Sequence, residues 1–429
     1  MPPKKSRAEI LAGLDGLRFD AVIIGGGING AAVARDASLR GLKVCLFEQG
    51  DFAGGTSSKS TKIAHGGLRY LRNREFGLVR ESQRERLLLR RLLPHLVKPQ
   101  SFCYPIYRND PDPVWKVRLG LTIYDLLSGL LYPKRHLSLS PTEALNDNPA
   151  MRPTELVAAM RYWDDRMDDA RICLETALSA EHAGATCLNY VRAVLAHRNK
   201  SGYKVDFDDV LTGAKGSVGA AAIVNCGGPW ADEVLTRVLG NPSHLLTPTK
   251  GVHLVVPRIP GEDALILQNP KDERTFFAIP WDDATLIGTT DTHYEGSRAD
   301  VRVEQEDVDY LIAAANYYLP GVGLQASDVI FSFAGLRPLV APEQEAVNEG
   351  KISRRHRVVV EPPGVVTLVG GKYTTFRQMA EDATDVLVET LGLPKRACTT
   401  RTRPYFDDIP STHHPAEDRG LWQIGRAHV

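Results

Sequence analysis

The stretch from Phe19 to Glu48, FDAVIIGGGINGAAVARDASLRGLKVCLFE, decides the fold. Its first six residues are an apolar run that predicts a buried parallel strand. Glycines follow at once, and the small residues after them predict a helix that ends near Gly41. A second apolar strand then ends in Glu48. Strand, glycine turn, helix and strand within about 30 residues form a βαβ unit, so we expect an α/β fold.

Length and composition indicate a large globular protein. At roughly 150 residues per domain, 429 residues predict two or three domains, or one α/β core with insertions. Hydrophobic residues make up 43% and charged residues 24%, which excludes disordered, collagen-like and coiled-coil classes. A formal net charge of zero gives no support to nucleic-acid binding.

The six cysteines show no CxxC spacing, which argues against a zinc site, a redox dithiol or a disulfide framework. We therefore expect a reducing compartment and no metal. The basic N-terminus is not followed by a long apolar run, so neither a signal peptide nor a spanning helix is expected there.

Further along the chain the pattern changes twice. Short alternating segments between residues 251 and 290 predict an antiparallel sheet, and two more apolar strands end at glycines. The expected helices span residues 76–97, 115–132, 171–182 and 373–391, and the expected later strands span 220–225 and 365–369.

Gly25, Gly27 and Gly30 form a GxGxxG pattern between a strand and a helix. In that context the glycines permit a tight turn, close approach to a pyrophosphate and close helix packing, with the helix N-terminus facing the phosphates. Glu48 lies near the usual offset for an acid that binds a ribose, which makes NADP an improbable ligand. The alternative interpretation is a glycine turn with no ligand.

The later sequence favours FAD over NAD. Thr56, Ser57 and Ser58 form a hydroxyl-rich loop suited to a pyrophosphate or flavin. Glycines at 227–228 and 370–371 bring two distant strand ends to the same sheet edge, whereas an NAD domain would be complete by then. A split cofactor domain that carries an inserted substrate domain accounts for this order.

Seven motifs resemble one family, the FAD-dependent sn-glycerol-3-phosphate dehydrogenases, which are relatives of the D-amino-acid-oxidase fold. The resemblance runs from about Phe19 to Leu393, and the His-Gly-Gly-Leu-Arg-Tyr block is its most specific part. Cys226-Gly227 departs slightly from the family's turn. The motifs are VIIGGGING (22–30), TSS (56–58), HGGLRYL (65–71), NCGGPW (225–230), GTTD (288–291), GLRP (335–338) and GGKYTT (370–375).

The resemblance implies a Rossmann-like FAD-binding domain interleaved with an antiparallel-sheet substrate domain. The FAD-binding domain is expected at 18–75, 165–250 and 330–395, and the substrate domain at 76–164 and 251–329. Residues 396–422 would begin a C-terminal helical domain that is otherwise missing. Residues 423–429 resemble translated sequencing-adaptor or cloning sequence, or else form a natural polar tail.

A glycerol phosphate carries a dianion, and arginine binds phosphate oxygens through its planar fork. Arg69, Arg337 and Lys372 each adjoin a turn or strand end that is expected to meet the cofactor. The alternative is three solvated cations on loops. With the family resemblance, we expect these three residues to bind the substrate, with Arg337 and Lys372 also acting in catalysis.

Oxidation of a secondary alcohol needs hydride transfer to the flavin N5 and a base for the hydroxyl proton. His253, in an apolar strand, is our candidate base because the family's pocket histidine falls here; otherwise it would be a core histidine. Tyr70 is expected to bind the substrate, and Thr289 to line the flavin. The expected cofactor-binding residues are Gly25, Gly27, Asn29, Gly30, Glu48, Thr56, Ser57, Ser58, His65, Gly66, Gly67, Gly227, Gly371, Lys372 and Thr374.

The acidic pairs Asp164-Asp165 and Asp168-Asp169 are interpreted as caps ahead of the helix at 171–182 rather than as metal ligands.

The resulting hypothesis is an FAD enzyme that oxidises sn-glycerol 3-phosphate to dihydroxyacetone phosphate and passes electrons to a membrane quinone. Two alternatives stay open: an oxygen-using oxidase of the same fold, acting on glycerol 3-phosphate or an amino acid, and a non-catalytic flavin-binding protein. A homodimer is a further expectation.

Residues 119–132 form an apolar run too short to span a bilayer. Trp115 and tyrosines lie along it, and Lys116, Arg118, Lys134 and Arg135 flank it. This pattern predicts peripheral attachment to anionic lipid on the cytoplasmic face of the membrane. A buried helix of the substrate domain is the alternative.

Overall fold

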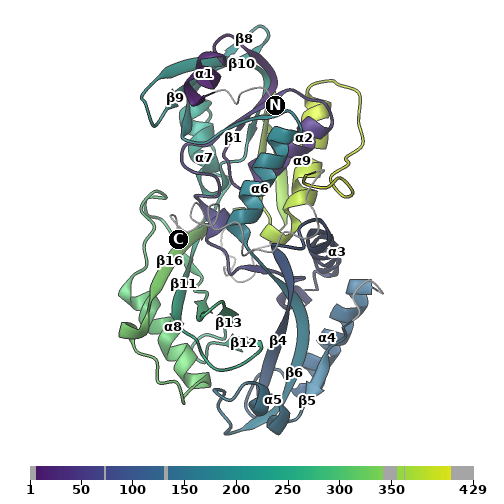
Figure 1. The fold of residues 1–429 in the computed structure, drawn as a ribbon, viewed down its shortest axis with the longest axis vertical. Helices are drawn as coiled ribbons and strands as arrows, with labels where there is room; N and C mark the ends of the chain where they lie inside the picture. The colour runs from purple at the N-terminus through teal and green to yellow at the C-terminus, as the bar shows by residue number, and fades with distance from the viewer. Residues whose placement is uncertain (1–5, 72–73, 130–133, 342–354, 362, 407–429) are drawn as a thin grey trace. The chain divides into compact units, whose positions relative to one another are not determined.

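The computed structural model describes residues 6–71, 74–129, 134–341, 355–361 and 363–406, and the side chain of Arg69 also lies outside the description (Figure 1). The chain divides into two compact units. Unit 1 consists of Met1–Ser58, Asp169–Pro248 and Pro338–Val429, and unit 2 of Lys59–Asp168 and Thr249–Arg337. Residues 59–75, which the sequence analysis groups with the cofactor domain, lie in unit 2.

Unit 1 is built on a sheet with a parallel centre. The central strands follow the order β18-β10-β1-β2-β7 and all pair in parallel. Antiparallel β17 extends one edge, and the β8–β9 hairpin pairs with β10. The strands are β1 (Arg18–Ile24), β2 (Val44–Phe47), β7 (Thr186–Leu188), β8 (Val191–Asn199), β9 (Gly202–Asp209), β10 (Lys215–Asn225), β17 (His356–Glu361) and β18 (Val365–Gly370).

Three helices of unit 1 lie side by side, with α2 packed against both α6 and α9 (Figure 1). Small side chains such as Ala31, Ala32 and Ala34 are buried on α2 and permit this close packing. The helical segments are α1 (Arg7–Ala12), α2 (Ile28–Leu39), η1 (Thr56–Ser58), α6 (Asp169–His182), η4 (Gly228–Trp230), α7 (Ala231–Glu233), η5 (Val234–Val238), η8 (Tyr373–Thr375) and α9 (Phe376–Thr390).

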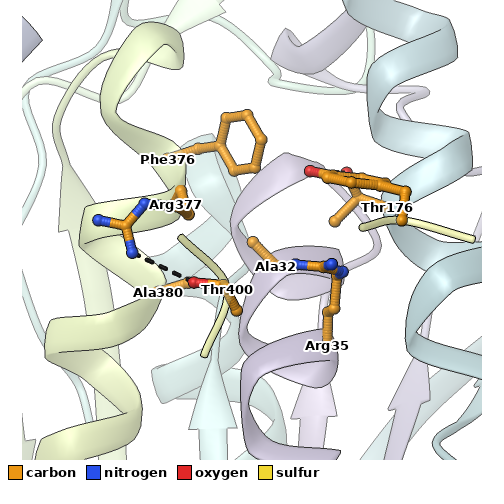
Figure 2. Close-up of a pocket in the computed structure, with 8 residues that line it drawn as sticks. Ala32, Arg35, Thr176, Phe376, Arg377, Ala380 and Thr400 are labelled. Carbon is orange, nitrogen blue, oxygen red and sulfur yellow. Dashed lines mark hydrogen bonds between the residues drawn. The ribbon is translucent and has the colours of Figure 1, made fainter. Parts of the chain in front are cut away.

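The described end of the chain, residues 396–406, also packs on unit 1. The guanidinium of buried Arg35 lies 4.3 Å from the centre of the Tyr405 ring and donates to the carbonyls of Arg403 and Pro404. Figure 2 shows Arg35 on α2 and Thr176 on α6 around a cavity of about 10 Å³, which is about the space of one water molecule. The cavity is therefore a packing feature rather than a ligand site. Residues 407–429, which include the expected tail, lie outside the described residues.

Unit 2 is a large sheet that is antiparallel except for the β12–β4 pair. Its order is β15-β11-β14-β13-β12-β4-β6-β3, with β16 beside β11 and β5 beside β6. The strands are β3 (Ile63–Ala64), β4 (Val97–Tyr107), β5 (Leu137–Leu139), β6 (Leu156–Met167), β11 (Thr249–Pro257), β12 (Ala264–Gln268), β13 (Thr275–Trp281), β14 (Ala284–Gly288), β15 (Thr292–His293) and β16 (Phe331–Arg337).

The sheet of unit 2 carries a core cluster that includes α8 residues and another that includes α4 residues. Leu311 of α8 packs in the first, and Leu121 and Tyr124 of α4 pack in the second. The helical segments of this unit are η2 (Leu68–Leu71), α3 (Phe76–Leu92), α4 (Val114–Ser128), α5 (Pro141–Asp147), α8 (Gln305–Tyr318) and η6 (Ala326–Asp328).

Two helices end earlier than the sequence predicts. Helix α3 stops at Leu92 rather than at residue 97, because Pro94 disfavours helical backbone at the residue before it. Helix α4 stops at Ser128, where Gly129 has a φ of 68°; residues 130–133 of the expected helix lie outside the description.

The interpretation of Asp164 and Asp165 as helix caps is wrong. Both belong to strand β6 and are buried, whereas α6 begins only at Asp169. One buried cation offsets both charges, since Arg86 Nη1 lies 3.0 Å from Asp164 Oδ1 and 3.6 Å from Asp165 Oδ2. Asp169 does lie in the first turn of α6, where an acid is favoured.

Candidate functional site

The turn between β1 and α2 leaves no room for a side chain at Gly25 or at Gly30. Gly25 has a φ of 108°, and a Cβ atom there would lie 2.5 Å from the carbonyl oxygen of Cys226. A Cβ atom on Gly30 would lie 1.9 Å from the carbonyl oxygen of Gly25. Only glycine at both positions lets α2 start directly at the ends of β1 and β10.

Gly27, the N-cap of α2, is not explained by packing. Its φ of −73° suits any residue, and a Cβ atom would meet only Ser57 Oγ, at 3.1 Å. A phosphate bound at the helix N-terminus would require a glycine here, because a side chain would stand between the phosphate and the backbone N–H groups. Asn29 lies in this first turn.

Glu48 holds the turn from the end of β2. Its Oε2 accepts a hydrogen bond from Gly26 N–H and its Oε1 accepts one from Gly50 N–H, both at 2.7 Å. Burial raises the pKa of Glu48, and the two donors oppose that shift. Each carboxylate oxygen keeps a further lone pair that is suited to a ribose hydroxyl.

The hydroxyl loop lies against the same helix end. Ser57 Oγ accepts a hydrogen bond from Ile28 N–H at 2.9 Å, so η1 satisfies one of the donors in the first turn of α2. Thr56 and Ser58 flank it and are half-buried.

Two more strand ends reach this edge of the unit 1 sheet. Strand β10 ends at Asn225, whose Oδ1 accepts a hydrogen bond from Gly227 N–H at 3.1 Å. Strand β18 ends at Gly370, and Gly371 follows with a φ of 84°. Lys372 and the buried Thr374 come next, at the start of η8. Because β1, β10 and β18 are parallel neighbours, their carboxyl ends share one edge.

His253 lies in unit 2, on β11 between β14 and β16. Its ring stacks on Phe333 at 4.9 Å and its Nε2 lies 3.0 Å from Thr61 Oγ1, while Nδ1 has no hydrogen-bond partner among the described residues. A Cβ atom on Gly288 would lie 2.3 Å from the ring, so that glycine makes room for it. Burial lowers the pKa of His253 well below 6.5, and the charges of Arg337 and Lys62 add to the effect.

Arg337 ends the neighbouring strand β16. Its Nη1 donates to Asp291 Oδ1 at 3.0 Å, and its Nη2 donates to Thr289 Oγ1 at 2.9 Å and to the Thr290 carbonyl at 3.0 Å. The side chain is 22% exposed, so its fixed fork is open to solvent in part. Thr289, expected beside the flavin, contacts this guanidinium.

The loop from His65 to Leu71 is the third feature of unit 2. The His65 and Tyr70 rings stack with centroids 6.5 Å apart, and Gly67 has a φ of 83°. Gly66 is buried. The backbone of Arg69 lies in η2, but its side chain lies outside the described residues.

Sequence reasoning missed four residues of the His253 and Arg337 surroundings: Thr61, Lys62, Asp291 and Phe333. Asp291 belongs to the GTTD motif and Thr61 extends the hydroxyl-rich run, so both had a sequence signal. Phe333 and Lys62 had none: the strand register brings Phe333 to His253, and the charge of Lys62 acts on His253 although the two residues are far apart in the sequence. Among the residues that the structure describes, no three His, Cys, Asp or Glu side chains could hold a metal ion.

The unit 1 residues fit FAD. The glycine turn excludes a Cβ atom at Gly25 and Gly30, Glu48 suits a ribose, and Gly227 and Gly371 follow the ends of β10 and β18 at the same edge of the sheet.

Comparisons with known proteins agree with this geometry. Residues 20–377 match a family model described as FAD dependent oxidoreductase. The chain is similar to a glycerol-3-phosphate dehydrogenase of Synechocystis sp., 39% identical over 90% of this chain and 73% of the relative. It is also similar to an aerobic glycerol-3-phosphate dehydrogenase of Staphylococcus haemolyticus, 37% identical over 93% of this chain and 73% of the relative.

Among solved structures, it resembles the glycerol-3-phosphate dehydrogenase from Bacillus halodurans complexed with FAD. The TM-score is 0.75 at 32% identity, and the match covers 92% of this chain and 69% of that chain.

We predict that Gly27→Val folds but loses FAD. The new side chain would occupy the phosphate path while meeting little protein, so FAD binding should weaken by at least about tenfold. The flavin absorbance per protein measures this. Gly120→Val is the matched control, because a Cβ atom there has no heavy atom within 4 Å. A yellow Gly27→Val protein with full flavin content would remove this turn from the cofactor site.

Proposed function

The chain belongs to the FAD dependent oxidoreductase family and, within it, to the glycerol-3-phosphate dehydrogenases, and on this basis we propose that it oxidises sn-glycerol 3-phosphate to dihydroxyacetone phosphate. The observation that carries the substrate proposal is the guanidinium of Arg337, held in a fixed orientation and partly exposed in unit 2. A planar fork in a fixed orientation suits a phosphate dianion.

We assign the phosphate to Arg337, Arg69 and Lys372, and a substrate hydroxyl to Tyr70. In the described structure Arg337 pairs with Asp291, so a bound phosphate would share the guanidinium with that carboxylate or displace it. Two anions at one cation compete. A change at Asp291 is therefore expected to alter the affinity of Arg337 for the substrate phosphate.

His253 is the proposed base. A histidine with a lowered pKa is neutral at physiological pH and can accept a proton at Nδ1, while Nε2 is held by Thr61. When bound, FAD supplies the two-electron acceptor for the hydride that leaves C2 of the substrate. The hydroxyl proton then goes to His253, so a secondary alcohol becomes a ketone.

We propose a membrane quinone as the final electron acceptor. Support comes from the similarity to dehydrogenases and from the surface of α4. Trp115, Leu119 and Leu126 of α4 are 67%, 52% and 74% exposed, at spacings that put them on one stripe of the helix. An apolar groove of about 220 Å³ lies beside this helix and includes Leu119 and Phe76.

The same stripe supports peripheral attachment to the cytoplasmic face of a membrane. Exposed Arg118, Lys134 and Arg135 would attract anionic lipid, and Lys116 pairs with Asp112 at 2.7 Å. The opposite side of α4 carries the buried Leu121 and Tyr124, so the helix is anchored to unit 2. Within the described parts of the chain, every helix is too short or too polar to cross a bilayer.

Arg337→Ala should raise the KM for glycerol 3-phosphate and leave the flavin spectrum intact. Loss of a charge-assisted contact typically removes about 1.5–3 kcal/mol, which is roughly ten- to a hundredfold in KM. Steady-state kinetics with a water-soluble dye acceptor measure it. Arg302→Ala, an exposed arginine of the same unit, is the control. An unchanged KM would exclude Arg337 from phosphate binding.

His253→Gln should lower kcat, and the rate should partly recover at high pH, where solvent base replaces the imidazole. Because the pKa of His253 is lowered well below 6.5, the wild-type kcat should stay level from neutral pH down through pH 6.5 and fall only well below it. A kcat profile across that range tests both points. Wild-type turnover in the variant would make His253 a structural core residue.

The double variant Lys116→Glu, Arg118→Glu should bind anionic vesicles more weakly than the wild type, because it replaces two cations of α4 by anions. Co-sedimentation with flavin-loaded protein measures the difference, with neutral vesicles as the control. Equal binding of both proteins, or none by either, would exclude α4 as the anchor.

The electron acceptor has its own test. Hydrogen peroxide release that matches substrate oxidation would identify oxygen as the acceptor.

A further inference from the structure

The loop from His65 to Leu71 begins on a buried carboxylate of unit 2. Gly66 N–H donates to Asp164 Oδ1 at 3.3 Å, and Asp164 is 2% exposed on β6. The hydroxyl of Tyr124, on α4, donates to the same carboxylate and lies 2.8 Å from both of its oxygens. Asp164 therefore joins the loop to a helix and a strand of the sheet.

A buried cation balances this carboxylate. Arg86 of α3 is 1% exposed, lies 3.0 Å from Asp164 Oδ1 through its Nη1, and donates to the Trp163 carbonyl at 3.0 Å. A buried ion pair stabilises a single arrangement only when further hydrogen bonds complete it, and here Tyr124 and Gly66 supply them. The carboxylate is thus fixed from three directions.

The loop backbone packs closely against the residues around Asp164. A Cβ atom on Gly66 would lie 2.5 Å from the amide of Gln83 and 2.5 Å from the hydroxyl oxygen of Tyr124. No side chain fits between, so the position of Gly66 follows the position of its neighbours. Gln83 is fully buried, and its amide has no hydrogen-bond partner among the described residues.

We propose that Asp164 is a positioning residue for the substrate: its ionised carboxylate holds Gly66 N–H and thereby sets the path of the η2 backbone, which carries Arg69 and Tyr70. The short connection between Gly66 and Tyr70 supports this. Tyr70 N–H donates to the Gly67 carbonyl at 2.9 Å and closes the turn that follows Gly66. The inference rests on the proposed role of Arg69 and Tyr70 in substrate binding.

The network also links substrate affinity to pH. Burial raises the pKa of Asp164 to about 6, opposed by Arg86 and by the hydrogen bonds from Tyr124 and Gly66, while the charge of Asp165 adds to the rise. The charged and titratable groups that act on it are Arg86 from α3, Tyr124 from α4, and Tyr162 and Asp165 from β6. As the pH falls through about 6, the carboxyl takes up a proton and accepts the Gly66 hydrogen bond less strongly.

The test compares Asp164→Asn with Asp165→Asn in the FAD-loaded full chain. Both changes remove a buried carboxylate beside Arg86 on the same strand, but the described hydrogen bonds link only Asp164 to Gly66. Asp164→Asn should raise the KM for glycerol 3-phosphate by about tenfold at neutral pH, the equivalent of one hydrogen bond to a charged group. Its kcat per bound flavin should stay near wild type, and Asp165→Asn should leave KM near wild type.

A pH series adds a readout that a purely structural role would not move. The substrate phosphate itself takes up a proton near about pH 6, and this affects every variant alike. The ratio of the Asp164→Asn KM to the wild-type KM should therefore be largest at neutral pH and approach one as the pH falls below about 6. A ratio independent of pH, or an equal KM rise in Asp165→Asn, would overturn the proposal.

Tyr124→Phe keeps the test usable if Asp164→Asn does not fold. It removes only the hydroxyl that orients the carboxylate, and we expect a smaller rise in KM with unchanged kcat. An unchanged KM would count against the positioning role.

Wild-type protein that does not oxidise glycerol 3-phosphate would refute the proposed function rather than the positioning role. If Tyr70→Phe left KM unchanged while Asp164→Asn raised it, the assignment of Tyr70 would fail and Asp164 would act through Arg69.

Discussion

The structure depends on one contact between backbone segments, the approach of α2 to the ends of β1 and β10. Gly30 and Gly25 come so close that a Cβ atom on Gly30 would lie 1.9 Å from the Gly25 carbonyl oxygen. Helix α2 can then lie on the parallel sheet and point its N-terminus at the carboxyl edge. Glu48, Ser57 and the ends of β10 and β18 are positioned relative to this turn, so one local constraint organises the cofactor site of unit 1.

In unit 2, glycines likewise leave space, but here a larger side chain of a neighbouring strand fills it. His253 and Arg337 lie on adjacent strands, and each occupies space that a neighbouring glycine leaves open, Gly288 for the imidazole and Gly251 for the guanidinium. Both side chains are then fixed by polar contacts, with Thr61 and with Asp291. Rigid strands that carry pre-oriented groups lose little freedom when a ligand binds, which favours precise positioning.

Burial decides the charge state of the polar groups in unit 2. His253 is buried and lies near the charges of Arg337 and Lys62, so it stays neutral, whereas Asp164 is buried beside Arg86 and stays ionised at neutral pH. Burial disfavours the charged form of both groups; at His253 the nearby cations act in the same direction, whereas at Asp164 the charge of Arg86 and the hydrogen bonds from Tyr124 and Gly66 oppose it. An unprotonated base and a charged anchor for the loop at Gly66 are the result.

The sequence alone determined the βαβ unit, the glycine turn, most strand positions, the antiparallel sheet after Gly251 and the family, because these depend on local periodicity and on short motifs. The ends of α3, before Pro94, and of α4, before Gly129, also had local causes, although both helices were predicted too long. Tertiary structure alone decided the rest. Asp164 and Asp165 looked like helix caps, but strand β6 buries them beside Arg86, and only the register of β11, β14 and β16 places Phe333 and Gly288 against His253. Such pairings join residues far apart in the chain, and no local pattern encodes which side chains a sheet brings face to face.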